Sequence, residues 1–219
     1  MKTFFFESIY NTQEFALKEL VDEPVLVISF KQEQGKGTAK RKWLNADQAL
    51  ACSLAINQSD ILVPKTLIPL IASYIYISKV NIVDKLSLKW PNDINLNQKK
   101  VGGVLVETIN EKICIGLGVN YFWNKPEILS AGSIYIEKQD VNLIKEHGEV
   151  WGEELTTTLK NGQFDIFEYK NRLTTLNKLV EYPDGRGWVQ DVNPDGSLSV
   201  KTIDNKIINL VSPLISELN

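Results

Sequence analysis

The chain has 219 residues, with 24 Lys and Arg against 27 Asp and Glu and a formal net charge of -3. Hydrophobic residues make up 43% and charged residues 23%, which excludes a disordered chain, a collagen-like repeat and a coiled coil. The small acidic excess does not favour nucleic acid or an anionic membrane as the main partner. A chain of this length can bury a large core without disulfides.

Cysteine and histidine usage excludes several chemistries. Cys52 and Cys114 lie in apolar runs and are expected to be buried free thiols in a reducing compartment. The single histidine, His147, lies in the polar stretch KEHGE, so zinc sites and histidine-based triads lack the residues they need. No signal-peptide pattern and no 18-residue apolar run occur, and we expect a cytoplasmic protein.

The first half of the chain predicts a helix, two buried strands and a second helix. Residues 11–22 place apolar side chains at helical spacing. The runs PVLVISF at 24–30 and ALACSLAIN at 49–57 are short and apolar, as in strands buried on both faces. Pro64 can open a long helix that ends near Val80.

A meander of short strands follows and forms the heart of the expected sheet. NQKK supplies the polar turn before its two longer strands. The strands are LSLKW (86–90), INLN (94–97), VGGVLVETI (101–109) and KICIGLGVN (112–120).

The last third predicts two helices and then a small β-barrel. Residues 141–178 form two amphipathic segments that are separated by Asn161 and Gly162 and cover one face of the sheet. Beyond Val180 the turn signals PDGRG, NPDG and IDNK separate short alternating strands, which is typical of a barrel. We therefore expect a larger domain at 1–179 and a β-domain at 180–219.

The loop 31–42 is a candidate anion cradle. It holds five basic residues and one acidic residue around Gly35 and Gly37. Glycines let backbone N–H groups approach an anion, although the spacing is not that of a Walker A loop. Trp43 follows directly and could stack on a purine. A solvated surface loop and a core tryptophan are the alternatives.

A second cluster of polar residues surrounds the meander. Residues Lys89 to Asp93 place a cation, an amide and a carboxylate at one proline-containing corner. Lys100 precedes Gly102 and Gly103, which leave a flat shelf where a ring could lie on backbone. Gly116 and Gly118, before Asn120, repeat this device on the neighbouring strand.

Together these residues suit adenylate formation. A carboxylate that attacks the α-phosphate of ATP brings two anions together, and fixed cations offset the repulsion. Lys36, Arg41, Lys89 and Lys100 are the candidates for this role. The mixed anhydride is destroyed by water, which requires a loop that closes over it.

Four motifs in this order resemble the biotin protein ligases, also called biotin–[acetyl-CoA-carboxylase] ligases. They are Gln32 with Gly35, Gly37 and a basic run into Trp43, then KWPNDI, KVGGVLVE and IGLGVN. The resemblance covers most of the chain. It implies an α/β (α+β) fold, with a mixed-sheet catalytic domain like that of class II aminoacyl-tRNA synthetases and an SH3-like C-terminal barrel.

The resemblance also implies the activity. Biotin and ATP, with Mg²⁺, would give biotinyl-5′-AMP. The biotinyl group would then pass to a lysine of a biotin carboxyl carrier protein domain in a biotin-dependent carboxylase. The lysine amine must lose its proton before it attacks.

The resemblance assigns residues to each part of the site. Catalytic roles fall on Lys100, Asp93, Lys89 and Arg41, and Asp93 would orient Mg²⁺ or the incoming amine. Biotin contacts fall on Asn11, Thr12, Gln13, Gln32, Gly35, Lys36, Gly37, Thr38, Lys100, Gly102 and Gly103. ATP contacts fall on Lys36, Arg41, Trp43, Lys89, Asn92 and Asn120.

The sequence departs from the family pattern at two motifs. The usual Ser-Thr-Asn near the N-terminus is Asn11-Thr12-Gln13 here, and Thr38 replaces an arginine of the basic loop. We therefore predict weaker retention of the adenylate. The motifs begin within the first dozen residues, so we expect no N-terminal DNA-binding domain.

Two other functions stay open at this point. One is a lipoate or octanoate ligase or transferase of the same fold, although the transferase needs a cysteine nucleophile that neither Cys52 nor Cys114 supplies beside the charged motifs. The other is a non-catalytic biotin sensor. The C-terminal barrel could be a structural cap, and sheet-edge pairing would allow a homodimer.

Overall fold

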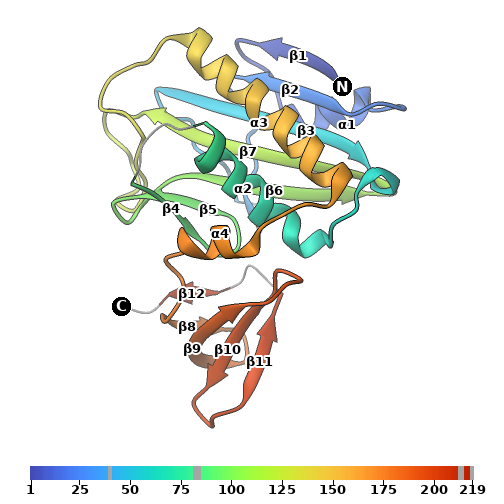
Figure 1. Cartoon of the computed structure of the whole chain (residues 1–219). Helices are drawn as coiled ribbons and strands as arrows, with labels where there is room; N and C mark the ends of the chain where they lie inside the picture. The colour runs from blue at the N-terminus through green and yellow to red at the C-terminus, as the bar shows by residue number, and fades with distance from the viewer. Residues whose placement is uncertain (39–40, 81–84, 212–214, 218–219) are drawn as a thin grey trace.

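The computed structural model describes residues 1–38, 41–80, 85–211 and 215–217 of the chain. They form a seven-stranded mixed sheet and a separate five-stranded antiparallel sheet (Figure 1). This confirms the predicted fold class of a mixed α/β sheet followed by a small β unit.

The large sheet has the order β1-β2-β3-β7-β6-β5-β4. Only β1 and β2 pair in parallel, and every later neighbour is antiparallel. The strands are β1 (Lys2–Phe6), β2 (Val25–Ser29), β3 (Gln48–Asn57), β4 (Leu86–Lys89), β5 (Asp93–Leu96), β6 (Lys99–Ile109) and β7 (Lys112–Phe122).

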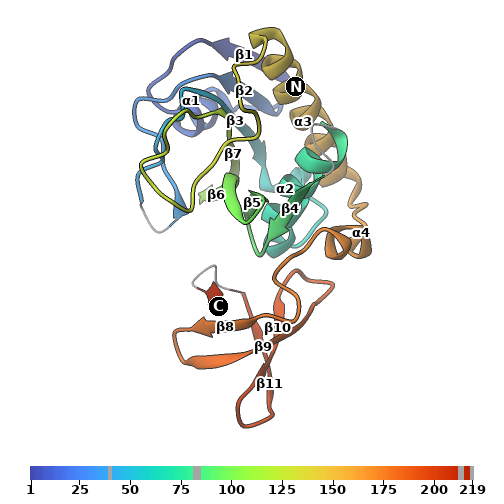
Figure 2. The same ribbon diagram turned by 90° about the vertical axis from the view of Figure 1, so that its left-hand side faces the viewer.

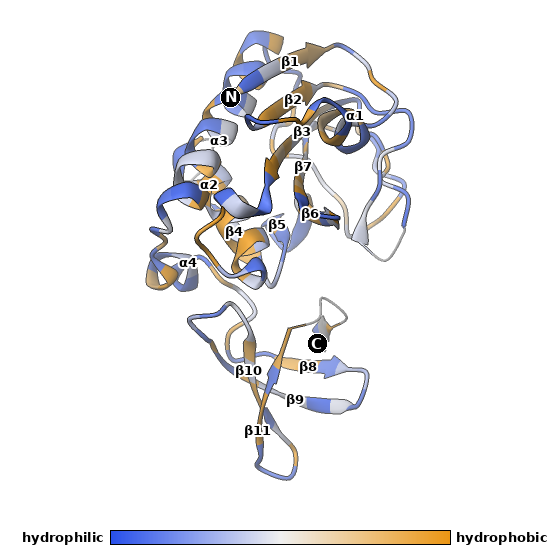
Figure 3. Ribbon diagram, turned by 90° about the vertical axis from the view of Figure 1, so that its right-hand side faces the viewer, coloured by the Kyte–Doolittle hydropathy of each residue, from blue (hydrophilic) through white to orange (hydrophobic). Residues whose placement is uncertain are grey.

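The two predicted buried strands and the meander are confirmed. Every residue of β2 is buried, and both β2 and β3 are predominantly apolar (Figure 3). Strand β1 was not predicted from the sequence. Its run KTFFF is mostly exposed or half-buried and acquires strand structure by pairing with β2 at the edge of the sheet.

Helices cover both faces of the large sheet (Figure 2). Helix α1 (Thr12–Glu19) packs on β2, β3 and β7 from one side. Helices α2 (Ile68–Lys79) and α3 (Val141–Asn161) pack together on the other side. The predicted end of the third helix is confirmed, because Gly162 closes α3 in the left-handed conformation with φ 71°.

Two predicted helices have shorter limits in the structure. The first was expected to reach residue 22 but ends at Glu19, where Leu20 turns to an extended conformation. The second was expected to start at Pro64, but short 3-10 turns at Gln58–Asp60 and Lys65–Leu67 come first. Pro69 lies in the first turn of α2. Backbone N–H groups in the first turn have no partner within the helix, so a proline there costs no hydrogen bond.

The prediction of a helix through residue 178 was wrong. Helix α4 covers only Ile166–Asn171. The chain beyond it pairs with β4, because the Leu88 N–H donates to the Arg172 carbonyl and the Thr174 N–H donates to the Leu88 carbonyl, at 2.8 Å each. Sheet pairing with a distant strand therefore overrides the local helical pattern.

The small sheet has the order β11-β10-β9-β8-β12. The predicted turns at PDGRG, NPDG and IDNK separate its strands. Its contacts with the large sheet include the Trp90 indole N–H, which donates to the Gly196 carbonyl at 3.0 Å. The division into two domains at residue 180 stays a prediction. The strands are β8 (Leu179–Tyr182), β9 (Gly185–Val192), β10 (Leu198–Thr202), β11 (Ile207–Leu210) and β12 (Ser216–Glu217).

The structure confirms the predicted state of both cysteines. Cys52 and Cys114 are buried and free. None of the helices in the described parts of the chain is both long and apolar enough to cross a membrane.

Candidate active site

A cavity of about 440 Å³ lies between the large sheet and the start of α1, because residues of both line it. Its walls come from the start of α1, the loop after β2, the corner between β4 and β6, and strand β7. Most of the residues predicted for the site line it. These are Thr12, Gln13, Gln32, Lys36, Gly37, Thr38, Arg41, Trp43, Lys89, Asn92, Asp93, Lys100, Gly103 and Asn120.

Two glycines of β7 form the floor of the cavity. The Gln13 side chain lies against Gly116, where an added Cβ would be 2.9 Å from Gln13 Cδ. The Trp43 indole lies against Gly118, where an added Cβ would be 2.9 Å from Trp43 Cζ2. A side chain at either position would occupy space that these two residues fill.

The glycines of β6 have different roles. Gly103 pairs with Gly118 in the sheet and leaves room for the Lys100 stem, which an added Cβ would approach to 3.2 Å. Gly102 does not line the cavity. An added Cβ there would be 2.9 Å from the Gly118 carbonyl, so this glycine permits close backbone packing.

Three uncharged polar side chains line the cavity together, and we call Thr12, Gln13 and Gln32 the neutral end. The Thr12 N–H and Oγ1 both donate to Gln32 Oε1, at 2.8 and 2.9 Å. The Gln13 Nε2 donates to the Leu105 carbonyl at 3.3 Å. Thr12 and Gln13 are buried, so this end is fixed by hydrogen bonds inside the protein.

Asn11 supports the neutral end from outside the cavity. Its Oδ1 caps α1 by accepting from the N–H groups of Gln13 and Glu14 at 3.0 Å. Its Nδ2 donates to the Gln34 carbonyl at 2.7 Å. Asn11 is buried and lines no part of the cavity, so the structure gives it the role of a helix cap.

The basic loop folds back on itself across the cavity. The Gly37 N–H donates to the Arg41 carbonyl at 2.7 Å, and the Trp43 N–H donates to the Gly35 carbonyl at 2.9 Å. Gly35 is buried against Trp43 and does not line the cavity. Lys40 of this loop lies outside the described residues.

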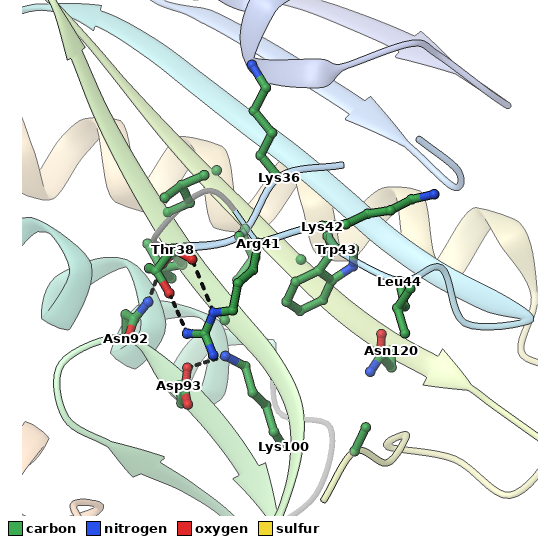
Figure 4. A pocket seen from close by; sticks show the side chains of 18 of the residues that line it. Lys36, Thr38, Arg41, Lys42, Trp43, Leu44, Asn92, Asp93, Lys100 and Asn120 are labelled. Carbon is green, nitrogen blue, oxygen red and sulfur yellow. Dashed lines mark hydrogen bonds and ion pairs between the residues drawn. The ribbon is translucent and has the colours of Figure 1, made fainter. Parts of the chain in front are cut away.

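Thr38 holds the guanidinium of Arg41 (Figure 4). Arg41 donates to the Thr38 carbonyl at 3.3 Å and to Thr38 Oγ1 at 3.2 Å. Lys36 points away from Arg41 and Lys100 and pairs with Glu14 at 2.7 Å. The hydrogen bond to Glu14 raises the pKa of Lys36 above its usual value.

A second group of lining side chains is basic, and we call Arg41, Lys89 and Lys100 the cationic end. Lys100 forms an ion pair with Asp93, and its Nζ lies 5.9 Å from the Trp43 ring centroid. Lys89 Nζ lies 3.8 Å from a carboxylate oxygen of Glu217, which belongs to the small sheet. The small sheet therefore reaches the cationic end.

Two asparagines stand beside these cations. Asn92 Nδ2 donates to the Val104 carbonyl at 2.7 Å, and Asn120 Nδ2 donates to the Gly132 carbonyl at 2.9 Å. The Asn120 Oδ1 is buried and has no hydrogen-bond partner among the described residues. An orphaned acceptor in a cavity wall is costly unless a ligand donates to it.

Sequence reasoning missed one wall of the cavity. Ile128, Ser130 and Ala131 line it, in a loop that follows β7. The Lys100 N–H donates to the Ser130 carbonyl at 2.8 Å, and the Gly132 N–H donates to the Lys100 carbonyl at 2.9 Å. The sequence ILSAG carries neither charge nor motif, so no signal in it could have identified this wall.

The cavity holds a single acidic side chain. Asp93 is the only carboxylate among its described lining residues. No group of three or more His, Cys, Asp or Glu residues that could hold a metal occurs within the described ranges. A magnesium ion carried by a nucleotide needs only one or two carboxylates from a protein, and Asp93 is placed to supply one.

The cysteines offer no nucleophile to the cavity. Cys52 borders it, which the sequence did not predict, but its Sγ points toward α3, where an added Cβ at Gly148 would be 2.8 Å away. Burial raises the pKa of Cys114 to about 12. Burial also raises the pKa of Cys52, so both thiols stay protonated.

Comparisons of sequence identify a family. Residues 5–120 match the model of the biotin/lipoate A/B protein ligase family. The bifunctional ligase/repressor BirA of Escherichia coli K12 is 28% identical over 123 residues, which are 51% of this chain and 38% of that protein. BirA of Bacillus subtilis 168 is 31% identical over 108 residues, 45% of this chain and 33% of that protein. The match thus spans only about a third of these curated relatives.

Comparisons of structure cover the whole fold. The biotin protein ligase of Aquifex aeolicus, solved with biotin and ATP, has a TM-score of 0.80 at 24% identity over 99% of this chain and 98% of that one. The biotin acetyl coenzyme A carboxylase synthetase of Helicobacter pylori, solved with biotinylated ATP, has a TM-score of 0.66 at 25% identity over 95% and 99%.

Proposed function

The chain belongs to the biotin/lipoate A/B protein ligase family, and from this premise we propose that it activates biotin with ATP and transfers biotin to a carrier protein. The observation that carries the proposal is the division of one cavity into a neutral end and a cationic end. Biotin itself has an uncharged ring and a carboxylate tail. A neutral end suits the ring, and the cations suit the carboxylate and the phosphates.

The first half-reaction joins the two anions. A biotin carboxylate oxygen attacks the α-phosphorus of ATP, the bond to the β-phosphate oxygen breaks, and pyrophosphate leaves with the electron pair. Arg41, Lys89 and Lys100 provide positive charge where the phosphates and the carboxylate meet. Lys100 is the best placed of the three, because it lies between Asp93 and the Trp43 ring.

The nucleotide base would lie between Trp43 and Asn120. The indole offers a flat apolar face, and the orphaned Asn120 Oδ1 is an acceptor for an exocyclic amino group. Adenine presents such an amino group. The base would then complete the hydrogen bonding of Asn120 that the described protein atoms leave unfinished.

Asp93 serves the cation or the amine in this proposal. A magnesium ion bound to ATP would neutralise phosphate charge and could take one carboxylate oxygen from Asp93. In the second half-reaction, a neutral lysine amine of the carrier attacks the acyl carbon, and AMP leaves from the mixed anhydride. Asp93 is the only carboxylate among the described lining residues, and we propose that it accepts a hydrogen bond or a proton from that amine.

The loop departures bear on how long the adenylate is held. Thr38 uses its carbonyl and hydroxyl to hold Arg41, and it adds no charge of its own. A loop with one cation fewer would retain an anionic intermediate less tightly. We therefore propose faster release of the adenylate than in a ligase with the full arginine set.

The decisive experiment is magnesium-dependent ATP–pyrophosphate exchange with biotin, lipoate and octanoate compared as the acid. Exchange with biotin alone is expected. Exchange with lipoate or octanoate would instead favour the other branch of the same family. Biotin binding with no exchange from any acid would indicate a sensor. Transfer is then tested by the mass increase of a biotin carboxyl carrier domain, with its target lysine replaced by alanine as the control.

A further inference from the structure

Ser53 is a polar residue in the middle of a buried strand. It lies in β3, pairs with Val27 of β2 and Gly116 of β7, and has no exposed surface. It does not line the cavity. A buried hydroxyl costs free energy unless it is hydrogen-bonded, so its partner indicates why it is there.

A short chain of hydrogen bonds leads from Ser53 to the neutral end. Ser53 Oγ donates to Thr12 Oγ1 at 2.7 Å. Thr12 Oγ1 has a single proton, and it donates that proton to Gln32 Oε1 at 2.9 Å. Ser53 therefore fixes the Thr12 hydroxyl as an acceptor on one side and a donor on the other.

The same contacts fix the Gln32 amide. Its Oε1 also accepts from the Thr12 N–H at 2.8 Å, which only an oxygen can do. The Nε2 must then face the other way, near Gly35, where an added Cβ would be 3.4 Å from it. Gln32 lines the cavity, and its Nε2 has no hydrogen-bond partner in the part of the chain that the structure describes.

We infer that Ser53 is a positioning residue, which acts through Thr12 to fix the orientation of the Gln32 amide in the cavity wall and so leaves its N–H donors free for a ligand. The group it selects is a neutral acceptor oxygen, such as the carbonyl of a cyclic urea. The inference rests on the proposed function, since biotin carries this group. Hydrogen bonds in series polarise one another, so the distant hydroxyl also strengthens the donors.

The test is Ser53→Ala, with biotin binding measured by calorimetry without ATP. The dissociation constant for biotin should rise about five- to tenfold, the factor expected for one neutral hydrogen bond. The KM for ATP and kcat at saturating biotin should not change. A general loss of packing would instead weaken the binding of biotin and of ATP together, and that outcome would overturn the inference.

A matched control and a second variant complete the design. Ser73 is also buried, but its Oγ donates to the Pro69 and Leu70 carbonyls of its own helix, so Ser73→Ala should leave biotin binding unchanged. Thr12→Val removes the middle hydroxyl and keeps the N–H. Its effect should match that of Ser53→Ala, and the double variant should be no worse than either single variant.

The outcomes separate this inference from the proposed function. If the unaltered protein does not bind biotin, the proposed function fails. If it binds biotin and Ser53→Ala binds equally well, only the inference about Ser53 fails. Should Ser53→Ala not fold, Thr12→Val alone decides, and unchanged biotin binding in that variant would overturn the relay.

Discussion

The two ends of the cavity differ in the side chains that form them and in how these side chains are held. At the neutral end, Thr12 and Gln13 are buried and their polar groups form hydrogen bonds within the protein. At the cationic end, Arg41, Lys89 and Lys100 are long side chains, held by oxygens of Thr38, Glu217 and Asp93. The neutral end is held by hydrogen bonds within the protein, whereas the cationic end is held by ion pairs and hydrogen bonds of long side chains that can exchange their partners.

This difference has a physical reason. A ring is recognised by fixed hydrogen bonds, because an unpaired polar atom at a buried site is costly. Phosphates are recognised by charge, which acts over a longer distance and tolerates movement of the side chain. Substitutions at the neutral end should therefore change ligand binding, and substitutions at the cationic end should change the chemical step.

Lys100→Ala should have the largest effect and would break the cationic end. We expect the rate of adenylate formation to fall by at least about a hundredfold, as for the loss of a charge that stabilises the transition state. Single-turnover formation of the adenylate measures this step. Lys99→Ala is the matched control, because Lys99 is exposed, does not line the cavity and should be replaceable without loss. Equal rates in both variants would remove Lys100 from the chemistry.

The parts that the sequence predicted are those governed by local pattern. The buried strands β2 and β3 are uniform apolar runs, and Gly162 ends α3 because its left-handed φ of 71° favours glycine. The two glycine pairs predicted a surface free of side chains. In the structure the side chains of Gln13 and Trp43 lie against Gly116 and Gly118, so these protein groups occupy the predicted shelf.

The parts that the sequence could not predict depend on contacts between distant segments. The segment after α4 has a helical pattern but pairs with β4 at Leu88 instead. Asn11 caps α1 and does not line the cavity, and its contact with biotin stays a prediction. The wall at residues 128–131 is formed by backbone hydrogen bonds to Lys100, and backbone leaves no signature in side-chain chemistry.

Gly118→Ala should have the next largest effect. It would test the part of the cavity, beside Trp43, that we propose binds the nucleotide base. The added methyl group would lie 2.9 Å from Cζ2 of Trp43, and the rigid indole must move to admit it. We expect the KM for ATP to rise about tenfold, which corresponds to roughly 1.4 kcal/mol. Biotin binding measured without ATP should stay within about twofold, because no contact of the neutral end changes.

Gly116→Ala is the counterpart at the neutral end, two positions away on the same strand. Its added methyl group would lie 2.9 Å from Cδ of Gln13, which is the far end of a flexible side chain that can rotate aside. We expect a smaller effect, a rise of about threefold in the dissociation constant for biotin, with the KM for ATP unchanged. If both glycine variants weakened the binding of biotin and of ATP by the same factor, the two ends would not be independent.

A third region lies on the opposite face of β7. Changes in this region should alter the binding of neither biotin nor ATP. Tyr76 donates to the Tyr121 hydroxyl at 2.9 Å, and that hydroxyl lies 2.6 Å from His147 Nδ1. Tyr121 follows Asn120 in the strand, so the two side chains lie on opposite faces. Burial lowers the pKa of His147 below its ordinary value, because the charged ring loses hydration.

Acid should therefore destabilise the protein through His147. The unfolded chain binds the proton first, at the ordinary histidine pKa of about 6.5, so this contribution is complete above that pH and is lost as the pH falls through the lower folded pKa. We expect the free energy of unfolding to fall by less than about 1 kcal/mol, since solvent screens this partly exposed ring. Urea unfolding at pH 8 and pH 5.5 measures this change in the free energy of unfolding, with His147→Gln as the control that removes the proton site.

The KM values for biotin and ATP should change by the same factor, or not change, between pH 8 and pH 5.5. A change confined to one end would show that the helix-covered face is coupled to the cavity.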